Sequence, residues 1–308
     1  MLVNMKEILS VANEKSFAVP AFNIGTCQIL KAVVDCCEEK KAPVILAIHP
    51  KELAFQGDSA MAAMRDAAEK ARVPVCIHMD HSSTVEEILH AVRTGFTSVM
   101  IDASHQSFEE NARISKQIVD MVHPLGISVE AELGTIGTTG NDQEGGTSEI
   151  IYTDPDDVVK FVQATGIDCL AIAIGTAHGI YPKGFKPELK LDLLTQIKKK
   201  AAVPLVLHGG SANPDEEIAE SVKRGINKIN ISSDIKDALY QELRKTLTND
   251  PKVREPIELY PEGIEAMKQV CSTRQTKSNT IVYNARRHCI CPAITSGRYS
   301  TRGKAYCS

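Results

Sequence analysis

Three histidines stand at points where the sequence changes from apolar to polar, and together they could hold a metal ion. His81 ends the run V-C-I-H-M-D-H, His178 ends A-I-G-T-A-H, and His208 ends V-L-H. Three neutral imidazole nitrogens with one open coordination position form a ligand set for catalytic zinc. A single histidine of this kind would more often be hydrogen-bonded scaffolding, but three at corresponding positions predict a metal centre.

Acidic side chains accompany these histidines. Asp80 directly precedes His81, and Asp102 and Glu132 lie at the ends of two other apolar runs. The carboxylates of Asp102 and Glu132 suit a second or alternate metal position. His78 shares a strand face with Asp80 by alternation but lies deeper, so we interpret it as a core histidine or one that orients Asp80 or a ligand.

Two turns rich in glycine and serine follow the last apolar runs. L-H-G-G-S-A-N contains Gly209, Gly210 and Ser211, and I-N-I-S-S-D contains Asn230, Ile231, Ser232 and Ser233. Both could be tight turns with a serine cap. Backbone N–H groups in glycine turns and at helix N-termini also bind anions. Because both turns occur together beside His208, we favour a phosphate site.

A long segment, 134–150, follows the run that ends near Glu132. Its glycines are spaced by three, which does not match a dinucleotide-binding fingerprint, and no helix follows directly. A loop of this length next to candidate ligands is typical of a movable cover. Asp142 and Glu144 are the acidic residues that it could bring toward a substrate.

Eight short runs rich in Val, Ile and Ala would position these residues. Most are nearly continuous in apolar residues, which is the pattern of parallel strands covered on both faces. The predicted strands are 18–23, 44–48, 73–80, 98–103, 128–134, 169–175, 204–210 and 228–232.

Amphipathic stretches alternate with these strands. The predicted helices are 25–40, 58–72, 83–94, 107–123, 155–165, 189–201, 214–224 and 234–248. Eight such units in sequence favour an α/β fold of the (β/α)8 TIM barrel type over a doubly wound sheet. In such barrels the chemistry lies at the carboxyl ends of the strands, where the three histidines fall.

Composition limits the class of protein. The chain has 308 residues, is 43% hydrophobic and contains no long uninterrupted apolar run or signal-peptide pattern, so we expect a soluble cytoplasmic protein. Residues 1–270 carry 28 basic and 39 acidic side chains, which argues against a nucleic-acid surface. Five cysteines (Cys27, Cys36, Cys37, Cys76 and Cys169) lie in apolar segments without a C-x-x-C pair, which predicts reduced, packed thiols.

The last part of the chain differs from the rest. We assign residues 1–270 to the barrel and 271–308 to an atypical basic, cysteine-containing C-terminal tail, with seven Lys or Arg and no Asp or Glu. Three interpretations stay open: a shifted reading frame, which we favour, a disordered basic tail that binds a partner, or a small metal site at His288, Cys289 and Cys291.

Taken together, the motifs resemble the class II, zinc-dependent fructose- or tagatose-bisphosphate aldolases (ketose-bisphosphate aldolases). The resemblance extends from about residue 3 to 270, and its motifs are specific in combination although each is short. They are A-V-P-A-F-N-I, I-H-M-D-H, M-I-D-A-S-H, V-E-A-E-L-G, A-I-G-T-A-H-G, V-L-H-G-G-S and K-I-N-I-S.

This resemblance implies a lyase that reversibly cleaves a ketose 1,6-bisphosphate to dihydroxyacetone phosphate and glyceraldehyde 3-phosphate. It implies Zn²⁺ on His81, His178 and His208, stabilising an enediolate, and Asp80 as the acid/base. Asp102 and Glu132 match acids near an alternate metal position, and the resemblance leaves room for a second or monovalent cation. It also implies substrate contacts by Asn23, Gly179, Gly209, Gly210, Ser211, Asn230, Ile231, Ser232 and Ser233.

Further expectations follow from the resemblance. It implies a homo-dimer or homo-tetramer, a phosphorylated sugar as partner, and no nucleic acid or membrane. It does not separate fructose from tagatose bisphosphate. Two other functions stay open at this point: a phosphosugar-binding barrel without activity, and a metal-dependent hydrolase, although the H-x-H that a hydrolase would need on the first strand is missing from A-F-N-I-G.

Overall fold

Eight parallel strands close into a barrel with helices outside, which confirms the predicted (β/α)8 fold. The computed structural model describes residues 1–140, 146–147, 149–181 and 187–278. Each strand pairs with the next along the chain, and the circle closes between the last strand and the first. The strands are β2 (Val19–Asn23), β3 (Val44–Ile48), β4 (Val75–Ser82), β5 (Ser98–Ile101), β6 (Ser128–Leu133), β8 (Cys169–Ile172), β10 (Leu205–Leu207) and β11 (Ile226–Ile231).

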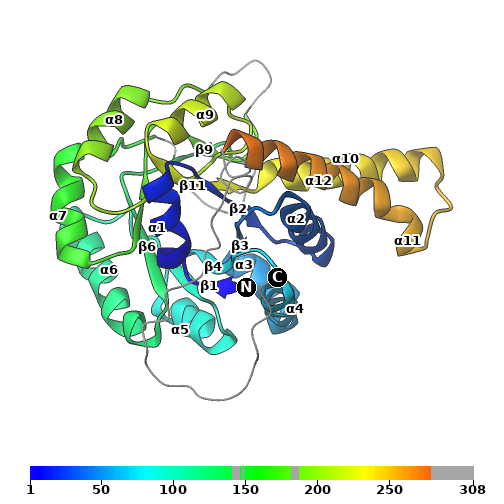
Figure 1. Ribbon diagram of the computed structural model, residues 1–308, viewed down its shortest axis with the longest axis horizontal. Coiled ribbons are helices and arrows are strands. Elements are labelled where there is room, and N and C mark those ends of the chain that lie inside the picture. Colours follow the sequence, from blue (N-terminus) through cyan, green and yellow to red (C-terminus); the bar gives the residue numbers. More distant parts are fainter. Residues whose placement is uncertain (141–145, 148, 182–186, 279–308) are drawn as a thin grey trace, which may run out of the picture.

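Helices cover the outside of this barrel (Figure 1). Every residue of the eight strands is buried, because side chains pack on both faces, and this is why the strands are nearly continuous apolar runs. The predicted helices correspond to α2 (Cys27–Lys40), α4 (Asp58–Lys70), α5 (Val85–Thr94), α6 (Phe108–Val122), α7 (Pro155–Thr165), α8 (Leu191–Lys200), α9 (Asp215–Lys223) and α10 (Ser233–Asn249).

Several further elements lie outside the predicted set. They are β1 (Leu2–Val3), α1 (Met5–Lys15), α3 (Pro50–Gln56), the 3₁₀ turn η1 (His123–Leu125), β7 (Gly137–Thr138), β9 (Ala177–His178) and α11 (Pro256–Leu259). The most consequential is α1, which closes the amino end of the barrel. Its buried face of Met5, Ile8, Leu9 and Ala12 belongs to the same apolar cluster as inward residues of the strands.

The last helix, α12 (Pro261–Lys277), continues past the boundary placed at residue 270. Cys271 is buried in the main core, and the carbonyl of Ser278 accepts a hydrogen bond from the Ala18 N–H at 3.0 Å. The boundary at 270 therefore lies inside a helix that is part of the barrel domain. The tail interpretations concern 279–308, including His288, Cys289 and Cys291, which lie outside the described residues.

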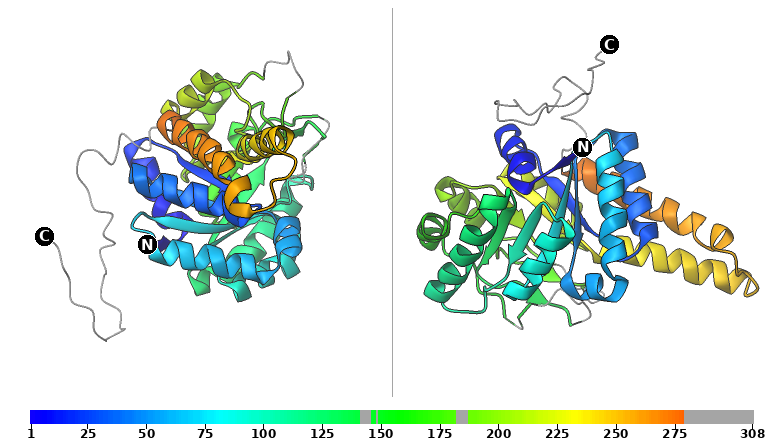
Figure 2. Two further views of the ribbon diagram at one scale, coloured as in Figure 1. Left: turned by 90° about the vertical axis from the view of Figure 1, so that its right-hand side faces the viewer. Right: turned by 90° about the horizontal axis from the view of Figure 1, so that it is seen from below.

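The pair α10 and α12 extends away from the barrel, with α11 at its far end (Figure 2). Along the part nearer the barrel, α12 contacts both α2 and α9. Helix α12 thus packs beside α2, which follows the first barrel strand β2, and beside α9, which follows the seventh barrel strand β10. Within the described residues, no helix is both long and apolar enough to cross a membrane.

The six cysteines that the structure describes are free thiols. Cys36, Cys37, Cys76 and Cys169 are buried, as predicted for packed thiols, and so is Cys271. Cys27 differs, because it is the first residue of α2 and its side chain is exposed. Cys27 belongs to an apolar segment, yet its position at the start of the helix leaves its side chain at the surface.

Candidate active site

The three predicted histidines meet at the carboxyl end of the barrel. His81 lies in β4, His178 in β9, which follows β8, and His208 directly after β10. One ring nitrogen from each lies within 4.8 Å of the others, and all three side chains are buried. The ring centroid of His81 lies 5.0 Å from that of His178 and 4.6 Å from that of His208. Residues from three separate strand ends therefore converge as the sequence analysis expected.

A break in β4 allows Asp80 and His81 to face the same site. Neighbouring residues of a regular strand point to opposite faces, so one of the two should point away from the barrel mouth. The register with β5 shifts between Met79 and Ser82, and His81 adopts a left-handed backbone with φ of 51°. A bulge of this kind re-aims side chains, and a non-glycine residue in this region costs about 1 to 3 kcal/mol.

Buried nitrogens without hydrogen-bond partners mark the site as one for a cation. Nε2 of His81 is fully buried and has no hydrogen-bond partner, and Nδ1 of His208 is also buried without a hydrogen bond, although the Glu132 carboxylate lies 3.2 Å away. A buried polar atom left unpaired costs about 1 to 3 kcal/mol. Coordination to a metal ion would satisfy both nitrogens, so the residues present fit the predicted zinc.

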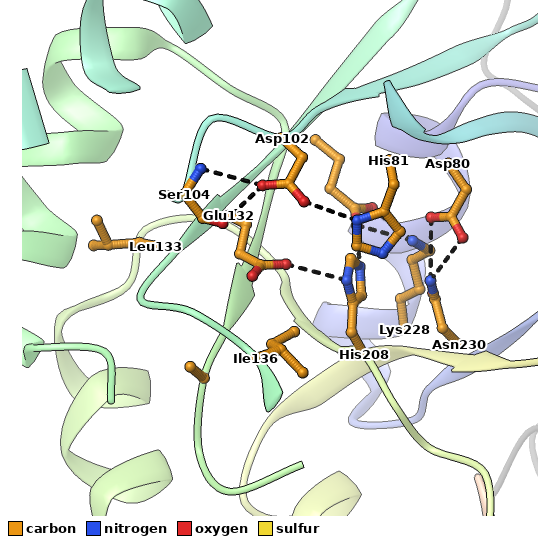
Figure 3. A network of polar contacts seen from close by, with 12 residues as sticks. Asp80, His81, Asp102, Ser104, Glu132, Leu133, Ile136, His208, Lys228 and Asn230 are labelled. Atoms are coloured by element: carbon orange, nitrogen blue, oxygen red, sulfur yellow. Dashed lines mark hydrogen bonds and ion pairs between the residues drawn. The ribbon is translucent and has the colours of Figure 1, made fainter. Parts of the chain in front are cut away.

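Asp102 and Glu132 lie beside two of these histidines (Figure 3). Oδ2 of Asp102 is 3.0 Å from Nδ1 of His81, on the side opposite the unpaired Nε2. Oε2 of Glu132 is 3.2 Å from Nδ1 of His208. His81, Asp102 and Glu132 also form a second group whose possible ligand atoms lie within 4.8 Å of one another. This placement suits both orientation of the histidines and an alternate metal position.

Asp80 is fully buried and is held by two amides. The side-chain N–H groups of Asn23 donate to its Oδ2 at 3.1 Å, and those of Asn230 donate to both oxygens at 3.1 and 3.2 Å. Burial raises the pKa of Asp80, but the charges of His81, Lys228 and His208 outweigh it and hold the pKa well below its usual value. The site therefore contains an ionised carboxylate whose direction is fixed by its neighbours.

Two charged residues beneath the site escaped the sequence analysis. Glu130 accepts from Nε2 of His208 at 2.8 Å, and Nζ of Lys228 lies 2.9 and 2.8 Å from the two oxygens of Glu130. Both side chains are completely buried. Alternation could have found them, because Glu130 shares a strand face with Glu132 and Lys228 shares one with Asn230.

His78 occupies the same buried layer and supports its neighbours. Its Nδ1 pairs with Ser98 Oγ at 2.9 Å, and its Nε2 lies 3.7 Å from both Asp80 and Glu130. Burial, followed by the Lys228 charge, lowers the pKa of His78 to about 3. A neutral imidazole at this depth agrees with the interpretation of His78 as a supporting residue.

The field of the site favours cations. Burial lowers the pKa of His81, but the Asp80 charge and the hydrogen bond with Asp102 outweigh it and raise the pKa to about 9. Burial acts in the same direction on His208, but the hydrogen bond with Glu130 and the neighbouring Glu132 carboxylate outweigh it and raise the pKa of His208 to about 9. Carboxylates that favour a positive charge on both imidazoles would also favour a metal ion there.

The two glycine turns lie against each other beside His208. The Gly210 N–H donates to the Asn230 carbonyl at 3.1 Å, and Ser211 Oγ accepts from the Ser232 N–H at 3.2 Å. A side chain on Gly210 would place its Cβ 2.4 Å from Ile229, so only glycine fits there. We call the loop 209–212 and the junction of β11 with α10 at 230–233 the paired loops. Ser233 begins α10, and Gly179 directly follows His178.

A cavity of about 190 Å³ opens beside the histidines. His81, Asp102, Glu132 and His178 line it, together with Ser104, His105, Thr135, Ile136, Gly146 and Thr147. Part of this wall is the segment after β6, in which β7 pairs with β9 beside His178. The long segment thus contacts the site, while Asp142 and Glu144 lie outside the described residues.

Comparisons with known proteins show the family of the chain. A family model described as class II fructose-bisphosphate aldolase matches residues 3–280. The fructose-bisphosphate aldolase of Geobacillus stearothermophilus is 40% identical over 273 residues, covering 87% of this chain and 93% of the relative. A probable fructose-bisphosphate aldolase of Bacillus subtilis (strain 168) is 39% identical over 272 residues, covering 87% and 94%.

Solved structures give the same fold. The YdjI aldolase from Escherichia coli K12 superposes with a TM-score of 0.78 at 33% sequence identity. The match covers 91% of this chain and 98% of that one. The similarity therefore includes both the barrel and the segments that carry the candidate site.

Proposed function

Because this chain belongs to the class II fructose-bisphosphate aldolases and is thus a metal-dependent aldolase, we propose that it reversibly cleaves a ketose 1,6-bisphosphate to dihydroxyacetone phosphate and glyceraldehyde 3-phosphate. The observation that carries this proposal is the convergence of His81, His178 and His208 beside the ionised Asp80. Family membership favours this reaction over the hydrolase and the inactive barrel.

The three histidines would hold Zn²⁺, and the unpaired nitrogens of His81 and His208 support this assignment. A zinc ion supplies a Lewis acid that stabilises negative charge on the oxygens of a ketose as a carbon–carbon bond breaks. Asp102 and Glu132, with His81, would form an alternate position for the metal or for a second cation. The proposal includes a monovalent ion as a form of this second cation.

Asp80 would carry the proton of the reaction. In cleavage, the C4 hydroxyl would lose its proton to Asp80, the electrons of the C3–C4 bond would pass to the ketose half, and the aldehyde would leave. C3 of the ketose half would then take up a proton from water to give dihydroxyacetone phosphate, and Asp80 would release the proton that it gained. In condensation, the same carboxyl returns that proton to the new hydroxyl oxygen. The amides of Asn23 and Asn230 hold the carboxylate in place, so reorientation costs little during the transfer. Asn23 would also contact the substrate.

The paired loops would hold a phosphate of the substrate. The residues that would form this site beside His208 are Gly179, Gly209, Gly210, Ser211, Asn230, Ile231, Ser232 and Ser233, through those backbone N–H groups that are not engaged between the two loops as the Gly210 and Ser232 N–H groups are. Such groups bind phosphate without a charged side chain, and the loops after the last two strands of this fold are its usual position. The substrate would thus be fixed at its phosphate while its carbonyl faces the histidines.

The test is an assay of purified protein with fructose and with tagatose 1,6-bisphosphate, which differ in configuration at C4. We expect release of triose phosphates from at least one of them, loss of that release after exhaustive chelation, and recovery on adding Zn²⁺. A protein that releases no triose phosphate from either sugar when loaded with zinc would contradict the proposal. Activity that survives removal of all metal would contradict the metal's role.

A further inference from the structure

We propose that Arg274, on α12, is a positioning residue for phosphate binding by the paired loops. The inference rests on the proposed function, because it requires these loops to bind the substrate phosphate. Arg274 lies beyond the barrel boundary expected from the sequence, in the part of α12 that contacts α9 and α10. Its side chain is only 11% exposed, so its contacts are largely shielded from solvent.

The Arg274 guanidinium joins the two helices that follow the paired loops. One amino group lies 3.2 Å from Oδ1 of Asp215, the first residue of α9, and the other pairs with Oδ2 of Asp234, the second residue of α10. The planar fork of an arginine can bridge two carboxylates in this way, whereas a lysine carries a single point charge. Arg274 therefore links α12 to the first turn of each helix that follows a paired loop.

Asp234 passes this restraint to the backbone of the loops. Its Oδ1 accepts from the Ala212 N–H at 3.0 Å, in the loop that follows β10. Ser211 Oγ accepts from the N–H of Asp234 at 3.4 Å and of Ser232 at 3.2 Å. Because Ala212 adopts a left-handed backbone with φ of 57°, this loop conformation depends on such restraints.

Arg274 would act through these contacts and not by touching the substrate, since both of its amino groups are engaged by carboxylates. Without the guanidinium, the negative charges of Asp215 and Asp234 near the ends of the paired loops would no longer be bridged. Lys277 lies 3.6 Å from Asp215 only and would not replace the bridge to Asp234. The N–H groups that face the phosphate would lose their alignment.

The experiment compares two substitutions on the same helix in the zinc-loaded, full-length protein. Arg274→Met keeps an apolar stem and removes the bridge, while Lys268→Met removes an ion pair with Glu39 that lies away from the paired loops. We expect Arg274→Met to weaken binding of dihydroxyacetone phosphate, measured by calorimetry, by about tenfold, the scale on which loss of an orienting partner acts elsewhere. KM for the bisphosphate should rise more than kcat falls, zinc content should not change, and Lys268→Met should bind normally.

A double-mutant cycle with Asp234→Asn tests whether Arg274 acts through Asp234. If Arg274 acts through Asp234, the double variant should bind dihydroxyacetone phosphate about as weakly as the weaker single variant. Additive losses, or unchanged affinity in Arg274→Met, would overturn the inference. Should Arg274→Met not fold, Arg274→Lys decides in its place, since it should also lose affinity and an unchanged value would overturn the proposal.

Calorimetry separates this inference from the proposed function. A parent protein that binds dihydroxyacetone phosphate but releases no triose phosphate refutes the reaction, while weaker binding by Arg274→Met still supports the role of Arg274. A parent protein that is active and an Arg274→Met variant that binds as tightly refute the role of Arg274 alone.

Discussion

The imidazole of His208 is fixed by charges that lie deeper than the proposed metal position. Glu130 accepts a hydrogen bond from Nε2, which leaves Nδ1 as the nitrogen that faces the site, and Lys228 neutralises Glu130 from the other side. The histidines and Asp80 could be predicted because they interrupt apolar runs at strand ends. Glu130 and Lys228 lie inside such runs, so alternation could place them on the inner face, but their pairing with each other depends on closure of the barrel.

Glu130→Gln should therefore weaken zinc binding. The neutral amide would accept a weaker hydrogen bond from His208 and would leave the buried Lys228 charge without its partner. We expect zinc affinity, measured by competition with a chromogenic chelator, to fall about 10- to 100-fold.

Glu110→Gln is the matched control, because it makes the same change in an exposed ion pair with Arg113. Its zinc affinity should equal that of the parent protein. Equal affinities for all three proteins would show that Glu130 does not orient His208.

The strands and helices of the barrel were predictable because apolar runs and amphipathic stretches follow one another along the chain, whereas the bulge in β4 and the end of α12 were not. All eight strands follow the apolar pattern, yet the bulge near His81 depends on the pairing of β4 with β5 and has no local signal. The sequence of α12 beyond Val270 is polar apart from Cys271, so its apolar periodicity fades although the helix continues. In contrast, α1 has apolar residues at helical spacing and could have been recognised.

Leu9→Ala tests the role of α1 as the closure of the amino end. Leu9 is completely buried against the inward side chains of the barrel, so its truncation should leave a cavity there. We expect the free energy of unfolding to fall by about 2 to 5 kcal/mol, measured by urea denaturation.

Leu89→Ala provides the comparison, because Leu89 lies on α5 with 44% of its surface exposed. The same truncation there should cost less, since little packing is lost. Similar losses at both positions would argue against α1 as part of the barrel core.

At the scale of the whole molecule, closure of the barrel is what creates the site. Asp80 and Asn230 are 150 positions apart in the chain, yet they form hydrogen bonds because the strands that carry them end at the same mouth. The sequence could predict this meeting only through the assumption of a closed barrel, which the pairing of β11 with β2 now supports. The pairing of β7 with β9 beside His178 and the packing of α12 behind the paired loops required the structure.

In the proposed reaction, Asp80 moves the proton beside a zinc ion held by three histidines. The most direct test is the rate of triose phosphate release by zinc-loaded Asp80→Asn, with bound zinc measured in the same sample. We expect zinc to remain at the parent level, because Asp80 is not one of the three ligands, and the rate to fall by about 10²- to 10⁴-fold. A zinc-loaded Asp80→Asn protein that works at the parent rate would contradict the account.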